Sequence, residues 1–82
     1  MVLDEVKSIV GNVLQLGPRL LTFGAETPLH GALPELDSMA VVTVITALEE
    51  HFGITVADTE IGAATFATLG SLSAFVERKL GA

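Results

Sequence analysis

The fold of this chain is decided by residues 37–53, Asp-Ser-Met-Ala-Val-Val-Thr-Val-Ile-Thr-Ala-Leu-Glu-Glu-His-Phe-Gly. Local propensity favours a β-strand, because residues 41–46 are all β-branched. Length and spacing favour a helix, since neither Gly nor Pro interrupts residues 38–52 and apolar residues recur at helical intervals, at Val41, Ile45, Leu48 and Phe52. We therefore predict a helix over Ser38–Phe52, held by packing rather than by propensity.

Two further helices are expected on either side of this segment. An apolar stripe predicts the first over Val2–Leu16, and it is formed by Val6, Ile9, Val10, Val13 and Leu14. Gly11 lies inside that helix, where it lowers stability relative to Ala. Thr68 is the expected N-cap of the last helix, Leu69–Leu80, whose apolar face comprises Leu69, Leu72, Phe75, Val76 and Leu80.

The connections between these helices are expected to differ. Gly17–Leu36 holds all three prolines and is rich in large apolar residues, so we expect it to lie over the core. A short helical turn is expected at Asp58–Ala64. The sequence thus predicts an all-α fold with three principal helices, one short one and a long first loop, in a single domain spanning residues 1–82.

Composition excludes several classes of function. Ten acidic against four basic residues give a net charge of −6, which disfavours nucleic acids and anionic membranes as partners. Without cysteine, thiol catalysis and disulfides are excluded. No metal site is expected, because His30 and His51 are scattered.

Ser38 stands where the long loop enters the central helix. A helix N-terminus presents free N–H groups and partial positive charge, so it favours a phosphate. Taken alone, Asp37-Ser38 is more often an ordinary N-cap, and either residue can serve as one. The surrounding motifs favour the functional interpretation.

The order of motifs along the chain resembles the acyl carrier proteins. Residues 36–39, Leu-Asp-Ser-Met, and residues 47–54, Ala-Leu-Glu-Glu-His-Phe-Gly-Ile, are similar to that family's serine motif and the block that follows it. Residues 66–72, Phe-Ala-Thr-Leu-Gly-Ser-Leu, are similar to the start of its last helix. The resemblance extends over nearly the whole chain, with all motifs in order.

The resemblance implies a four-helix bundle of acyl-carrier type and a carrier rather than an enzyme. In that family the serine, here Ser38, receives 4′-phosphopantetheine from coenzyme A through a separate phosphopantetheinyl transferase. The thiol of that group holds acyl groups as thioesters and presents them to acyl-transferring and acyl-modifying enzymes with basic docking patches. The resemblance also implies a cytoplasmic monomer of a fatty-acid, polyketide-like or other accessory biosynthetic pathway.

The expected partner face surrounds Ser38. The acidic residues of this face are expected to attract a positively charged patch on a partner, and they are Glu35, Asp37, Glu49 and Glu50. The commonest fatty-acid carriers are acidic at the front of this helix, whereas Ala40 and Thr43 stand at those positions here, so the centre of the expected partner face is formed by Met39, Ala40 and Thr43. This departure indicates a dedicated carrier of an accessory pathway.

Two other functions fit the sequence. One is an unmodified helical interaction module that kept the carrier fold and lost the cofactor. The other is a small hydrolase that uses Ser38 and a histidine. Treatment with coenzyme A and a transferase distinguishes the carrier from both alternatives, because only the carrier gains mass.

Overall fold

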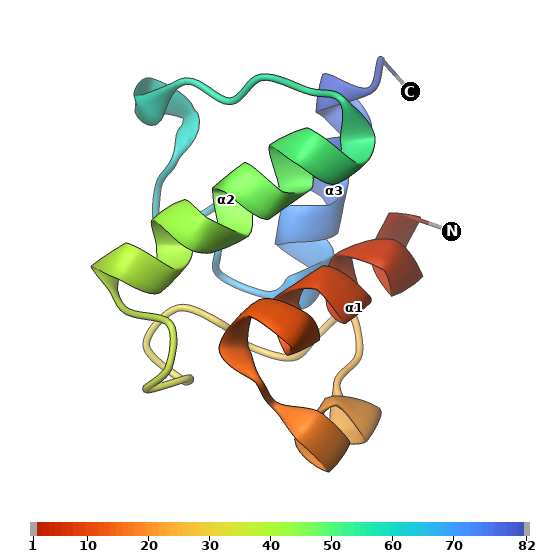
Figure 1. Cartoon of the computed structure of the whole chain (residues 1–82), viewed down its shortest axis with the longest axis vertical. Helices are drawn as coiled ribbons and strands as arrows, with labels where there is room; N and C mark the ends of the chain where they lie inside the picture. Colours follow the sequence, from red (N-terminus) through yellow and green to blue (C-terminus); the bar gives the residue numbers. More distant parts are fainter. Residues whose placement is uncertain (1, 82) are drawn as a thin grey trace.

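Three α-helices frame the protein in the computed structural model, which describes residues 2–81 (Figure 1). They are α1 (Val2–Leu14), α2 (Ser38–Phe52) and α3 (Leu69–Lys79). Figure 1 shows α1 and α2 side by side in opposite directions, with α3 crossing behind them. Two short 3₁₀ helices, η1 (Gly17–Thr22) and η2 (Asp58–Glu60), lie in the connections. The predicted all-α fold is confirmed, with η2 as the short third helix.

The helix α2 has the predicted bounds despite its β-branched residues. Its inner face is held by the burial of Val44, Ile45 and Leu48 against the rest of the core. Val41 and Phe52, which spacing places on the same face, are only half-buried because they lie in the first and last turns. Packing therefore overrides the local preference for a strand.

The helix α1 ends two residues earlier than the sequence predicts. Gln15 adopts a left-handed φ of 55°, a conformation that usually favours Gly. The Leu16 N–H then donates to the Gly11 carbonyl at 3.0 Å, which closes the helix end. Leu16, predicted as the last helical residue, is instead buried in the core as the chain turns away.

Two glycines allow the segment between α1 and α2 to pack closely against the helices. We call this segment, residues 15–37, the first connection. A Cβ on Gly11 of α1 would clash with a methyl carbon of Leu20. A Cβ on Gly70 of α3 would lie 2.7 Å from the carbonyl oxygen of Ala25, which accepts the Gly70 N–H. Gly11 is thus not merely an unfavourable residue for a helix, because its missing side chain makes room for η1.

The first connection lies over the core, as predicted. Leu29 and Leu33 are buried in the main cluster. Backbone hydrogen bonds join this segment to the start of α3, from Leu29 N–H to the Ala67 carbonyl at 3.1 Å and from Leu69 N–H to the Thr27 carbonyl at 2.9 Å. Its 3₁₀ helix η1 was not predicted, and Leu21 on it is 84% exposed.

The residues from 53 to 68, which we call the second connection, are less regular than predicted. The expected helical turn at Asp58–Ala64 shortens to η2, and turns follow it. Thr68 caps α3 as predicted, and the Ser71 N–H donates to its hydroxyl at 3.0 Å. Leu80 lies beyond the end of α3 and is largely exposed, so it is not part of the buried face.

Candidate functional site

The two candidate capping residues at the N-terminus of α2 have different roles. Asp37 is the N-cap, since its carboxylate accepts the Ala40 N–H at 2.8 Å and its carbonyl accepts the Val41 N–H at 2.9 Å. Ser38 is the first helical residue and is exposed. The ordinary capping role therefore belongs to Asp37 and leaves the Ser38 hydroxyl free for chemistry.

The backbone beside Ser38 offers two hydrogen-bond donors. The amides of Ser38 and Met39 begin the helix, where no preceding helical turn supplies an acceptor. In the part of the chain that the structure describes, neither amide has a backbone acceptor. Together with the positive end of the helix dipole, they suit a phosphate ester on the serine oxygen.

The three apolar or small residues predicted for the partner face are not equally accessible. Met39 is 78% exposed, directly after Ser38. Thr43 is exposed one turn further along, and its hydroxyl donates to the Met39 carbonyl at 3.0 Å. Ala40 is half-buried and packs against the core cluster. The surface next to Ser38 thus combines the carboxylate of Asp37 on one side with the Met39 side chain on the other.

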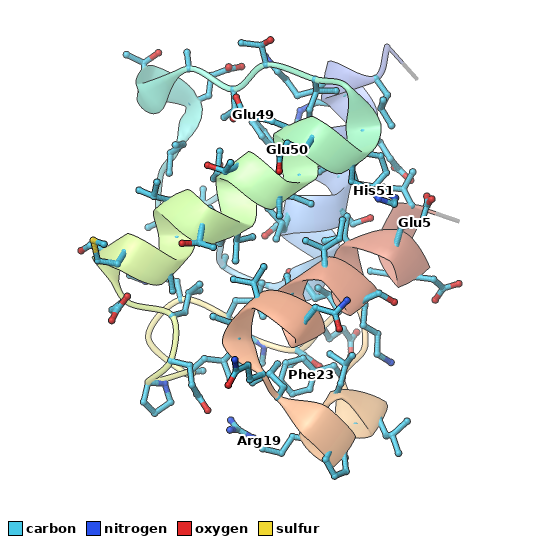
Figure 2. All side chains as sticks on the ribbon, viewed as in Figure 1. Glu5, Arg19, Phe23, Glu49, Glu50 and His51 are labelled. Atoms are coloured by element: carbon cyan, nitrogen blue, oxygen red, sulfur yellow. The ribbon has the colours of Figure 1, made fainter. Side chains whose placement is uncertain are left out.

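The acidic residues predicted to attract partners are also unequal. Glu35 is ion-paired with Arg19, and the hydrogen bond from the guanidinium lowers the pKa of the Glu35 carboxyl. Glu49 is half-buried, and its carboxylate accepts the Val56 N–H at 2.8 Å. Glu50 is fully on the surface. Figure 2 shows Glu49 directed toward the second connection, Glu50 on the neighbouring helix surface, and Arg19 at the far end of the molecule on η1.

The histidines do not form a catalytic group with Ser38. His51 Nε2 lies 3.4 Å from Glu5 Oε1, where the C-terminal end of α2 meets the start of α1 (Figure 2). That position is thirteen residues beyond Ser38, about 20 Å along the helix axis. His30 lies in the first connection, where its backbone N–H donates to the Phe66 carbonyl at 2.8 Å. Among the described residues, no cluster of His, Asp and Glu could hold a metal ion.

Comparisons with known proteins identify the family. A family model described as a phosphopantetheine attachment site matches residues 4–76. No curated protein matches the chain. Among solved structures, the solution NMR structure of the holo acyl carrier protein from Nitrosomonas europaea is 59% identical, with a TM-score of 0.89, covering 98% of this chain and 96% of that one. The chain therefore belongs to the phosphopantetheine-attachment family.

Family membership confirms several expectations from the sequence. The resemblance to acyl carrier proteins is correct, and the cofactor is covalent 4′-phosphopantetheine. The protein is a non-catalytic carrier, so the hydrolase hypothesis is wrong. Carriers of this family work with a phosphopantetheinyl transferase and with acyl-handling enzymes. No helix in residues 2–81 meets the length and apolarity that a membrane crossing requires.

Proposed function

We propose that this protein is an acyl carrier in which residues 1–82 form a single domain, with 4′-phosphopantetheine attached to Ser38. The proposal rests on the different roles of Asp37 and Ser38 at the start of α2. Asp37 accepts the capping hydrogen bond, and Ser38 keeps an exposed hydroxyl. The similarity to a holo carrier along almost the full length of both chains supports the carrier function.

Ser38 supplies the oxygen to which the group is attached. Its Oγ forms a bond to the coenzyme A phosphorus on the pantetheine side, while the pyrophosphate P–O bond breaks and adenosine 3′,5′-bisphosphate leaves. The hydroxyl proton passes to the transferase or to solvent. The Ser38 and Met39 amides would stabilise the negative phosphodiester at the end of α2. When bound, the group supplies the thiol that this cysteine-free chain lacks.

The partners in this proposal are a phosphopantetheinyl transferase and enzymes that transfer or modify acyl thioesters in the cytoplasm. Ala40 and Thr43, in place of the acidic residues of common fatty-acid carriers, support an accessory pathway, polyketide-like or of a related kind. The net charge of −6 supports a monomer, because two copies repel each other.

The test is the intact mass of the apo protein after incubation with coenzyme A, Mg²⁺ and a broad-specificity phosphopantetheinyl transferase. We expect the wild type to gain one phosphopantetheine and Ser38→Ala to gain none. Ser8→Ala is the matched control, because Ser8 is an exposed helical serine on α1. A gain that persists in Ser38→Ala would assign the group elsewhere. No gain in the wild type would favour the unmodified interaction module.

A further inference from the structure

Ser38 follows a short segment, residues 34–37, that connects the buried part of the first connection to α2. Leu33, just before this segment, is buried, and Leu36 within it is half-buried against the core cluster. The Leu36 N–H donates to the Leu33 carbonyl at 3.0 Å, which closes a local turn. A local turn does not fix the segment against the rest of the protein, so its position depends on contacts with other elements.

Glu35 joins this segment to η1 through an ion pair with Arg19. The guanidinium donates to both carboxylate oxygens, from Nη1 to Oε2 and from Nη2 to Oε1 at 3.5 Å. A contact of this forked kind fixes the direction of the carboxylate as well as its distance. Figure 2 shows the Arg19 side chain extending from η1 toward the end of the first connection.

Arg19 is itself held in place, because η1 fits closely against α1. Leu20, the next residue, fills the space that a Cβ on Gly11 would occupy. The Arg19 N–H donates to the Leu16 carbonyl at 3.3 Å, and the Arg19 carbonyl accepts the Thr22 hydroxyl at 2.8 Å. The ion pair therefore connects the residues before Ser38 to α1 through a fixed part of η1.

We infer that Arg19 and Glu35 are positioning residues for the loading of Ser38, because their ion pair holds the segment that presents the serine to the phosphopantetheinyl transferase. This inference rests on the proposed attachment at Ser38. It gives Glu35 a role within the carrier instead of the expected attraction of a positively charged partner. A carboxylate that is paired with a guanidinium presents little net charge to a partner.

The two roles of Glu35 predict opposite effects of removing the Arg19 charge. If the ion pair positions Ser38, Arg19→Gln releases residues 34–37 and slows loading. If Glu35 instead attracts the transferase, Arg19→Gln leaves an unpaired carboxylate on the surface and speeds loading. Glu35→Gln slows loading in both cases, so the direction of the Arg19 effect decides between the two roles.

The test is the steady-state rate of loading by a broad-specificity transferase with coenzyme A and Mg²⁺, at varied concentrations of the apo protein. We expect Arg19→Gln to raise KM about two- to fivefold and to leave kcat unchanged, because a displaced segment lowers the fraction of carrier that can bind. Lys79→Gln is the matched control, since it removes the same charge and another ion pair, Lys79–Glu60 at 2.9 Å, which joins α3 to η2. Its KM should equal that of the wild type.

Exchange of the two charges provides a rescue. Arg19→Glu combined with Glu35→Arg keeps the net charge at −6 and restores an ion pair between the same positions. Its KM should lie closer to that of the wild type than the KM of either Arg19→Gln or Glu35→Gln. A change that acted only through net charge would give no such recovery.

Amide hydrogen exchange of the apo protein measures the position of the segment without any loading reaction. The Leu36 N–H donates to the Leu33 carbonyl and the Ala40 N–H to the Asp37 carboxylate, so both amides lose protection when the segment is displaced. We expect both to exchange about two- to fivefold faster in Arg19→Gln and to keep the wild-type rate in Lys79→Gln.

Three results would overturn the inference: an unchanged or lower KM in Arg19→Gln, a KM raised equally in Lys79→Gln, or unchanged exchange at both amides in Arg19→Gln. Absence of loading in the wild type would instead contradict the attachment at Ser38. In that case the exchange rates would still decide whether the ion pair holds residues 34–37.

Discussion

The first and second connections both lack an α-helix, but they are held in place by different interactions. The first connection buries Leu16, Leu29 and Leu33 in the core. It also exchanges backbone hydrogen bonds with the residues around Phe66–Gly70. Its order therefore depends on apolar burial and on backbone pairing, which pH and salt affect little.

The second connection is attached by carboxylates as well as by half-buried side chains that pack against the core, Ile54, Val56 and Ile61. Glu49 accepts the Val56 N–H at 2.8 Å, and Glu60 accepts the Ala57 N–H and the Lys79 ammonium, both at 2.9 Å. Phe66, near its end, is its fully buried large residue. The first connection thus contributes three large side chains to the buried core, whereas the second contributes Phe66 and otherwise contacts the core through half-buried side chains.

The largest effect should come from removing a core side chain of the first connection. Leu29 is fully buried, so Leu29→Ala should lower the free energy of unfolding by about 2–5 kcal/mol. The matched variant is Ile61→Ala, because Ile61 is half-buried in the second connection, and it should lose less than half as much. Urea unfolding measures both. Equal losses would remove the contrast between the two connections.

A smaller effect should come from closing the space beneath the first connection. Gly70→Ala places a Cβ against the Ala25 carbonyl oxygen, and the backbone must move. The clash should outweigh the gain in helix propensity of about 1 kcal/mol and leave a net loss of about 1–2 kcal/mol. Gly62→Ala in the second connection meets no atom within 4 Å. It should stay within about 0.5 kcal/mol of the wild type in the same urea experiment.

The smallest effect should come from replacing Glu60 of η2, whose carboxylate is ion-paired with Lys79 of α3. Hydrogen bonds from the Ala57 N–H and the Lys79 ammonium lower the pKa of Glu60 below its ordinary value. A lowered pKa in the folded state adds stability above the unfolded pKa, and that stability is lost as the pH falls through the folded pKa. Wild type should therefore melt slightly higher than Glu60→Gln at neutral pH.

Thermal unfolding followed by circular dichroism at pH 7 and at about pH 3 checks this expectation. The difference in Tm between the wild type and Glu60→Gln should shrink toward zero at the acidic pH. Leu29→Ala provides the reference, because its loss of apolar burial should remain at both values. A difference for Glu60→Gln that does not depend on pH would show that the ion pair does not fasten η2.

Features that depend on neighbouring residues in the chain were predictable from the sequence. The bounds of α2, the Thr68 cap and the buried first connection follow from spacing, capping chemistry and apolar content. The close packing of the first connection against Gly11 and Gly70 was not predictable, because it depends on which loop crosses each helix. At the candidate site, the motif indicated Ser38, but nothing local showed that Glu35 and Glu49 have partners within the protein.

The hydrogen bonds between the first connection and the start of α3 also bear on the order of folding. They join Thr27 to Leu69 and Leu29 to Ala67, so they close a chain loop that contains all of α2. Closing such a long loop costs entropy before any contact offsets it, and the β-branched residues 41–46 make α2 a weak helix by itself. We therefore expect the helix that presents Ser38 to form late, once distant parts of the chain have met. With the proposed attachment at Ser38, the transferase would then load only chains that have finished folding, because Ser38 lies at the start of a helix only in the folded chain.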